Sequence, residues 1–132
     1  MYVDSSALLK RYVDEPDSDL AEQLLRSDPV LVTSWITAVE VRRNLARLAT
    51  AAELIQLRQL VNADLDTMAL VSADQVVCEA AAEIAEHLGV RSLDAVHLAS
   101  AQRLGVSGLG FLTFDLRQAQ AARALGFMVH GA

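Results

Sequence analysis

Ser92-Leu93-Asp94-Ala95-Val96-His97-Leu98-Ala99-Ser100-Ala101 has the pattern of a helix that begins at a capping residue and packs closely against its neighbours. Leu93, Val96 and Ser100 share one helical face, and the alanines between them permit close packing. Ser92 is expected to cap this helix. Asp94 lies in the first turn, where exposed N–H groups and the helix dipole favour a charged carboxylate. Taken alone, Asp94 is best explained as a residue that helps the helix begin, so a functional role requires other carboxylates nearby.

Short apolar runs alternate with helical patterns on both sides of this stretch. Helices are expected at residues 5–12, 17–26, 36–50, 51–66, 74–88, 92–104 and 116–125, and strands at 2–3, 30–33, 68–71, 111–113 and 127–129. This alternation predicts a parallel sheet covered by helices, a three-layer α/β/α fold. The 132 residues contain no linker, repeat or low-complexity segment, so one domain spanning 1–132 is expected.

Composition limits the cellular setting and the kinds of partner. No apolar run approaches the roughly 20 residues that span a bilayer, and the N-terminus lacks the order of a signal peptide. We therefore expect a cytoplasmic protein without a membrane partner. The single cysteine, Cys78, excludes an internal disulfide, and its place in a helical pattern predicts a small core residue.

The formal net charge of −6 argues against broad electrostatic binding to nucleic acid. It does not exclude a nuclease, because a site that holds a metal must itself be acidic. Arg91, Arg103 and Arg117 lie near acidic residues in the sequence, and each is expected to be a solvated side chain or part of a surface ion pair.

Four acidic residues are expected near one edge of the sheet. Asp4 ends the first strand, Asp115 follows the fourth, Asp94 begins the helix before the fourth, and Glu40 lies in the helix after the second. Ligands of such sheets bind at the carboxyl ends of strands, where the strand order reverses. If the first and fourth strands are neighbours, these acids gather at one place.

Each acid also has a purely structural explanation. Asp4 and Asp115 are placed to cap helices, and Thr37-x-x-Glu40 matches a capping box, although Ser34 is the better placed cap. Carboxylates that crowd together repel one another unless a cation neutralises them. Ligands with oxygen donors alone indicate Mg²⁺ or Mn²⁺, and no Cys or HxxxH spacing indicates zinc.

The chain resembles PIN-domain ribonucleases, and more closely the VapC toxins of bacterial VapBC toxin–antitoxin pairs. Four segments carry the resemblance in the family's order: Val3-Asp4-Ser5-Ser6-Ala7-Leu8, Thr37-Ala38-Val39-Glu40-Val41, Leu93-Asp94-Ala95-Val96-His97-Leu98-Ala99 and Leu112-Thr113-Phe114-Asp115. The resemblance implies a five-stranded parallel sheet in the order 3-2-1-4-5. That order places the first and fourth strands side by side.

The resemblance also implies an activity, the metal-dependent hydrolysis of phosphodiester bonds in RNA by an endoribonuclease toxin. Asp4, Glu40, Asp94 and Asp115 would be the catalytic residues. Asp4, Asp94 and Asp115 would hold Mg²⁺ (or Mn²⁺), and Glu40 would ligate it or position water. In-line attack by a water that the metal activates would leave a 5′-phosphate and a 3′-hydroxyl.

Partners follow from the same resemblance. We expect a cognate VapB-type antitoxin, whose C-terminal arm presents Arg or Lys to the acids, and a homodimer. The helices at 36–50 and 51–66 provide a surface for that arm or for a second copy. The RNA that is cleaved is left open, with transfer RNA and ribosomal RNA loops both compatible. The competing interpretation is a catalytically inactive PIN-fold binding module, and the presence of all four acids counts against it.

Other residues allow two interpretations each. Ser5 and Thr113 either orient a carboxylate or phosphate oxygen, or only form capping and strand-end hydrogen bonds. His97 is either a general base or a surface or packing residue, and we leave it out of the site. Trp35 is expected to pack rather than to stack on a base. Gly105, Gly108 and Gly110 precede a strand and so are not a phosphate-binding loop.

Overall fold

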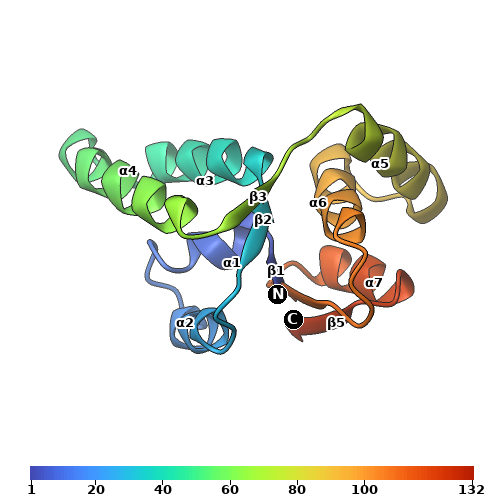
Figure 1. Cartoon of the computed structure of the whole chain (residues 1–132). Coiled ribbons are helices and arrows are strands. Elements are labelled where there is room, and N and C mark those ends of the chain that lie inside the picture. Colours follow the sequence, from blue (N-terminus) through green and yellow to red (C-terminus); the bar gives the residue numbers. More distant parts are fainter.

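A computed structural model describes all of residues 1–132 as five strands and seven helices (Figure 1). In chain order the elements are β1 (Tyr2–Val3), α1 (Ser5–Leu9), α2 (Ser18–Arg26), β2 (Val32–Ser34), α3 (Trp35–Leu48), α4 (Ala51–Asp66), β3 (Ala69–Val71), α5 (Gln75–Leu88), α6 (Ser92–Arg103), β4 (Gly110–Thr113), α7 (Leu116–Ala124) and β5 (Met128–Gly131). The predicted elements are all present, and their ends shift by a few residues.

The five strands form one parallel sheet in the order β3-β2-β1-β4-β5, which confirms the expected order. Strand β1 lies in the middle, where Tyr2 is in register with Val32 of β2 and with Phe111 of β4. Strands β2 and β3 lie on one side of β1, and β4 and β5 lie on the other, so the strand order reverses at β1. The carboxyl ends of β1 and β4 are therefore neighbours at the switch point where ligands of open α/β sheets bind.

The two faces of the sheet carry separate hydrophobic cores. Tyr2 and Phe111 face α5, α6 and α7, whereas Val3 and Leu112 face α1 to α4. Successive strand residues point to opposite faces, so two short strands supply both cores. In the first core the Phe111 ring stacks on Tyr2, with ring centroids 5.1 Å apart, and packs against Phe127. The predicted three-layer α/β/α architecture is confirmed.

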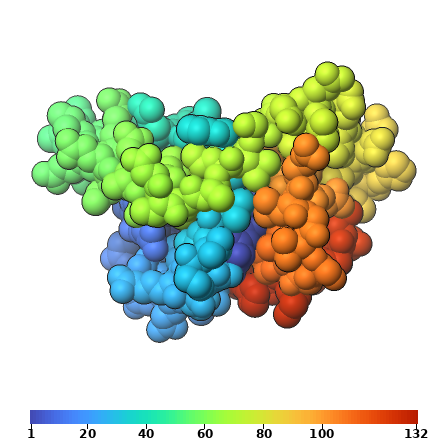
Figure 2. Space-filling view, in the orientation of Figure 1, coloured from blue at the N-terminus to red at the C-terminus, as the bar shows by residue number.

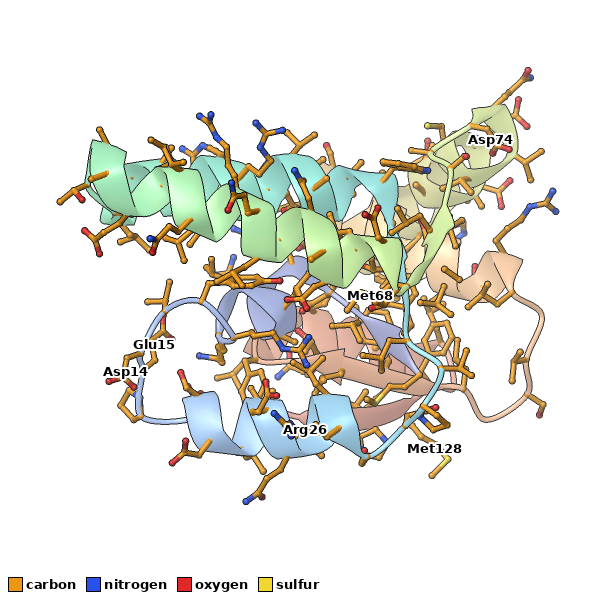
Figure 3. The ribbon with its side chains drawn as sticks, turned by 60° about the vertical axis from the view of Figure 1, so that its left-hand side comes forward. Asp14, Glu15, Arg26, Met68, Asp74 and Met128 are labelled. Atoms are coloured by element: carbon orange, nitrogen blue, oxygen red, sulfur yellow. The ribbon has the colours of Figure 1, made fainter.

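Helices α3 and α4 run side by side and extend beyond the sheet at one end of the molecule, while α5 projects at the other (Figures 1 and 2). Met68 lies where α4 gives way to β3, and Asp74 caps the start of α5 (Figure 3). None of the helices combines the length and the apolar character that crossing a membrane requires.

Three local predictions were wrong. Arg91, not Ser92, occupies the N-cap position of α6, and no side chain caps that helix. The first helix, which Asp4 caps as its position allowed, ends at Leu9, earlier than expected. Cys78 is exposed because it lies beside the inward stripe of α5, which Val77 begins, and not within it. Each of these errors concerns a single position, because hydrophobic periodicity does not determine the exact cap, end or exposure of one residue.

Helix α4 begins with a complete capping box, which lies at Thr50 and Glu53. The Thr50 hydroxyl accepts from the Glu53 amide at 3.3 Å, and the Glu53 carboxylate accepts from the Thr50 amide at 3.1 Å. The alternative box at Thr37 and Glu40 is absent, because Ser34 caps α3 as expected.

Thr50→Ala is expected to lower the free energy of unfolding by about 1 kcal/mol, the usual cost of removing an N-cap hydroxyl. Urea unfolding followed by circular dichroism measures the change. Glu53→Gln is the control, since glutamine also completes a capping box and should unfold near the wild-type midpoint. Equal losses in the two variants would contradict the assignment.

Candidate active site

The four acids predicted from the sequence line one cavity of about 190 Å³. They come from four separate places in the fold: Asp4 before α1, Glu40 in α3, Asp94 in the first turn of α6 and Asp115 before α7. The other polar side chains that line the cavity are Ser5, Ser6, Asn44, Arg91 and His97. The structure thus brings the predicted residues together at the switch point of the sheet.

Asp4 is buried, and both of its carboxylate oxygens are held. Oδ1 accepts from the Ser6 hydroxyl at 2.7 Å and from the Ala7 amide at 3.0 Å, and Oδ2 accepts from the Thr113 hydroxyl. Burial raises the pKa of Asp4, and these hydrogen bonds offset only part of that effect. Thr113 therefore orients a carboxylate, one of the two roles that its position allowed.

Glu40 is held by Ser5 and His97. The Ser5 hydroxyl donates to Oε1 at 2.6 Å, and the same oxygen lies 2.7 Å from His97 Nε2. Burial raises the pKa of Glu40, but the hydrogen bonds from His97 and Ser5 outweigh it, so the net pKa is lowered. Glu40 is thereby kept ionised and fixed in direction inside a half-buried site.

His97 is the residue that sequence reasoning left out. It is only 2% exposed, with Nδ1 placed 2.8 Å from the Tyr2 hydroxyl. An ionised Glu40 can only accept, so Nε2 carries the hydrogen that it donates to Glu40. Burial raises the pKa of Tyr2 well above its ordinary value, so Tyr2 keeps its proton and donates to Nδ1. Both ring nitrogens are occupied, so His97 positions Glu40 instead of serving as a free base.

Arg91 supplies a positive charge at the mouth of the site. Its Nε lies 2.9 Å from Asp94 Oδ2, and its Nη2 lies 3.3 Å from Asp115 Oδ2. The hydrogen bond to Asp94 raises the pKa of Arg91, whose side chain is 68% exposed. This confirms the surface ion pair expected for Arg91. In this arrangement no three His, Cys, Asp or Glu side chains are close enough to hold a metal ion.

Asp115 is tied to the backbone through only one of its oxygens. Oδ1 accepts from the amides of Arg117 and Gln118 at 2.8 and 3.0 Å, and so caps α7. Oδ2 contacts only the exposed Arg91 side chain. The acid set offers carboxylate oxygens, and the one cation that pairs with two of them, Arg91, is exposed to solvent. Such a donor set suits a hard divalent cation, which would take the place of the Arg91 link.

A sequence model of the PIN domain matches residues 1–124. The chain belongs to the PIN-domain family. Ribonuclease VapC46 of Mycobacterium tuberculosis is 37% identical over 129 residues, which covers 98% of this chain and 95% of that protein.

Solved structures with low sequence identity share the fold of this PIN domain. The crystal structure of Mycobacterium tuberculosis VapC20, described as a sarcin–ricin loop cleaving toxin, has a TM-score of 0.76 at 19% identity, and the match covers 99% of this chain and 97% of VapC20. A toxin–antitoxin complex from Klebsiella pneumoniae has a TM-score of 0.68 at 20% identity, covering 86% of this chain and 85% of the matched chain.

Trp35 and the glycines before β4 lie outside the acid cluster of this PIN domain. Trp35 is 55% exposed, so the expectation that it packs inside was wrong. Its place as the first residue of α3, directly after the capping serine, turns it outward. Gly105 and Gly108 have φ angles of 63° and 65° and lie before β4, at the opposite edge from the acids. Their positive φ angles suit the tight connection between α6 and β4.

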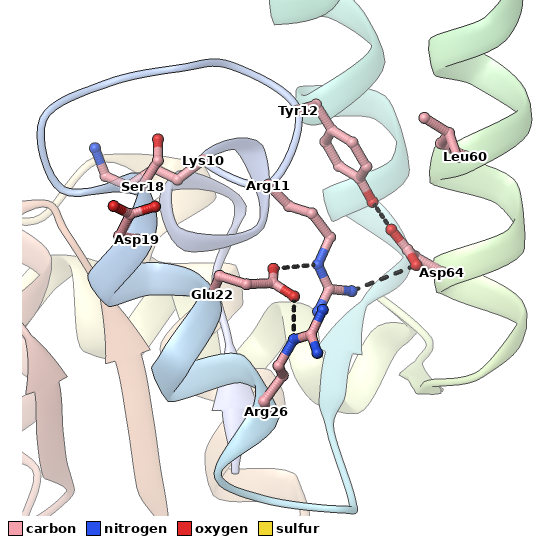
Figure 4. A pocket seen from close by; sticks show the side chains of 9 residues that line it. All are labelled: Lys10, Arg11, Tyr12, Ser18, Asp19, Glu22, Arg26, Leu60 and Asp64. Atoms are coloured by element: carbon pink, nitrogen blue, oxygen red, sulfur yellow. Dashed lines mark hydrogen bonds and ion pairs between the residues drawn. The ribbon is translucent and has the colours of Figure 1, made fainter.

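A larger cavity of about 670 Å³ lies between α2 and α4 and shares no residue with the acidic cavity (Figure 4). Arg11 lies 3.0 Å from Glu22 and 3.4 Å from Asp64, and Glu22 also pairs with Arg26 at 2.7 Å. Tyr12 donates to Asp64, and burial raises the pKa of Tyr12. These charges are satisfied within the protein, so the network ties the segment after α1 to α2 and α4 and does not resemble a ligand site.

Proposed function

We propose that this PIN domain is an endoribonuclease toxin that hydrolyses RNA with the help of Mg²⁺ or Mn²⁺. One observation carries the proposal: four acids from four distant segments line a single cavity at the switch point of the sheet. Relatives named as ribonucleases, matched over nearly the whole chain, support the same activity.

Three acids are proposed to hold the cation: Asp4, Asp94 and Asp115. All three carboxylates line the shared cavity, and the helix starts at Asp4 and Asp115 fix two of them. Oxygen-only ligands suit a hard divalent cation, which would draw the three together in place of the Arg91 ion pairs. A divalent cation supplies Lewis-acid activation of water and neutralises charge on the phosphate when it is bound there.

Glu40 is proposed to orient the attacking water and to receive its proton. The hydrogen bonds from His97 and Ser5 both hold Oε1, and the Glu40 side chain lines the cavity. Attack in line with the leaving 3′-oxygen would yield a 5′-phosphate and a 3′-hydroxyl. Tyr2 and His97 act from behind Glu40 and set the direction of its carboxylate.

An antitoxin partner is proposed as well, supported by the structural likeness to a chain of a toxin–antitoxin complex. A basic side chain of the antitoxin would compete for the acids much as Arg91 contacts Asp94 and Asp115. We further propose a single domain over residues 1–132, a cytoplasmic location and a homodimer. The exposed apolar side chains of α3, among them Trp35 and Val39, are consistent with a second copy packing there.

The test uses protein stripped with EDTA and then given Mg²⁺, Mn²⁺ or no metal, together with a fluorescent single-stranded RNA. Cleavage is expected only with added metal, and the downstream products should carry 5′-phosphates that a 5′-phosphate-dependent exonuclease digests. Calorimetry of Mn²⁺ binding provides the control for an intact site. Cleavage that persists in EDTA would reject the metal, and metal binding without cleavage of any RNA would favour the inactive binding module.

A further inference from the structure

A second cavity, of about 450 Å³, opens directly beside the acidic one. Asp94 and Arg91 line both, so the two cavities meet at the carboxylate that is proposed to hold the metal. One wall is the turn that joins α5 to α6, and the other is α7. Its volume lies within the range of sites that take small organic ligands.

The wall from α7 has a regular pattern. Arg117, Gln120, Ala121 and Ala124 follow one another at spacings of 3, 4 and 7 residues from the first, which places them on a single helical face. The α5–α6 turn contributes apolar side chains opposite them, Leu88 and Val90. The cavity is thus lined by two guanidinium groups and Asp94 together with an amide and apolar side chains.

The charge of Arg117 has no partner within the protein. Arg11, Arg26 and Arg91 form ion pairs with carboxylates, whereas the exposed guanidinium of Arg117 forms none. In a chain with a formal net charge of −6, such a cation at the border of an acid cluster is free to bind an anionic group. A guanidinium binds phosphate oxygens with two parallel hydrogen bonds.

We infer that this cavity is the subsite for the nucleotide next to the scissile phosphate of single-stranded RNA. Arg117 contacts the phosphate of that nucleotide, Gln120 lies where it meets the edge of the base, and the base packs against Leu88 and Val90. We expect the cavity to accept one unstacked nucleotide, which single-stranded RNA can supply and a duplex, whose bases are stacked and paired, cannot. This inference rests on the proposed function and adds the residues that hold the strand.

Arg117→Gln tests the subsite, and Arg103→Gln is the matched control, since Arg103 is also exposed, unpaired and helical. With Mn²⁺ and single-stranded RNA, Arg117→Gln should raise KM about tenfold and leave kcat within about twofold. The slope of log RNA affinity against log salt concentration, measured by anisotropy in EDTA, should fall by about the amount that one phosphate contact contributes. Calorimetry should find the Mn²⁺ affinity of both variants close to that of wild type.

Ala124→Leu is a second variant, which fills the cavity without changing the charge. It should also raise KM several-fold. Equal weakening by Arg117→Gln and Arg103→Gln would show diffuse attraction and overturn the subsite, as would wild-type KM values in both Arg117→Gln and Ala124→Leu. With either of these results, RNA cleavage by the wild-type protein would still support the proposed function. If wild type neither binds nor cleaves RNA with Mn²⁺, both the proposed function and the subsite are wrong.

Discussion

Asp4→Asn is expected to reduce metal-dependent RNA cleavage by more than about a hundredfold, because removing groups that only orient a metal's ligands already costs about 10- to 100-fold. Asparagine retains the size of Asp4 and one carbonyl oxygen, so the bonds from Ser6 and the Ala7 amide persist. The fold should therefore survive. The loss of charge removes the strongest attraction that this position has for a divalent cation.

The same substitution is expected to raise the melting temperature of the metal-free protein by about 3 °C. Burial raises the pKa of Asp4, so the folded protein holds this proton more tightly than the unfolded chain. The contribution of Asp4 to stability is therefore greatest at low pH, and it falls as the pH rises through the pKa of the folded state. Asparagine does not titrate, so its advantage over wild type should grow from about pH 4 toward neutral pH.

Cleavage assays and thermal unfolding at several pH values, both with EDTA-stripped protein, measure the two effects together. The exposed Asp14 provides the control (Figure 3), and Asp14→Asn should change neither cleavage nor melting temperature. An Asp4→Asn protein that cleaves RNA at the wild-type rate would remove Asp4 from the site. A variant less stable than wild type at pH 7 would show that the buried charge is already compensated.

Phe111→Ala is expected to lower the free energy of unfolding by about 3–5 kcal/mol, the range for large aromatic residues in cores. Phe111 is fully buried at the centre of β4, where its ring stacks on Tyr2 and packs against Phe127. Truncation leaves a cavity between the sheet and the helices that cover it. Because Tyr2 also holds His97, the site should loosen along with the core.

Urea unfolding gives the free energy, provided that the transition of the variant stays cooperative. Leu116→Ala removes a large apolar side chain that is 71% exposed, and it should change stability by no more than about 0.5 kcal/mol. A loss below about 2 kcal/mol in Phe111→Ala would mean that the neighbouring rings collapse into the space.

The fold followed from the sequence because its signals are local and repeated. Helix α4 was predicted with the bounds that it has, and α5 ends where Gly89 adopts the left-handed conformation that commonly closes a helix. The first and last residues of the strands were harder to predict. Strand β5 extends to Gly131, which the short apolar run did not predict, because pairing with β4 determines where it ends.

Asp4, Asp94 and Asp115 were predictable because each stands at the end of a strand or the start of a helix, where topology fixes its place, whereas Glu40 reaches the cavity from inside α3. The environment of His97 was not predictable, since Tyr2, Ser5 and Glu40 reach it from three other segments. The exposure of Cys78 was missed for a related reason. A helical pattern gives the direction of the buried stripe, but a neighbour about 100° away lies at its border, and only packing decides on which side it falls.

Asp4 and Asp115 each combine a proposed ligand with the start of a helix, and this has an evolutionary consequence. A mutation at either position would alter both the proposed activity and the N-cap of a helix, so the two selective pressures would not be independent. A gene copy released from toxicity but still selected to fold should keep Asn, Ser or Thr at these positions, because those residues cap helices without a full negative charge. Glu40 caps no helix, so substitutions at this position should accumulate more freely in such a lineage.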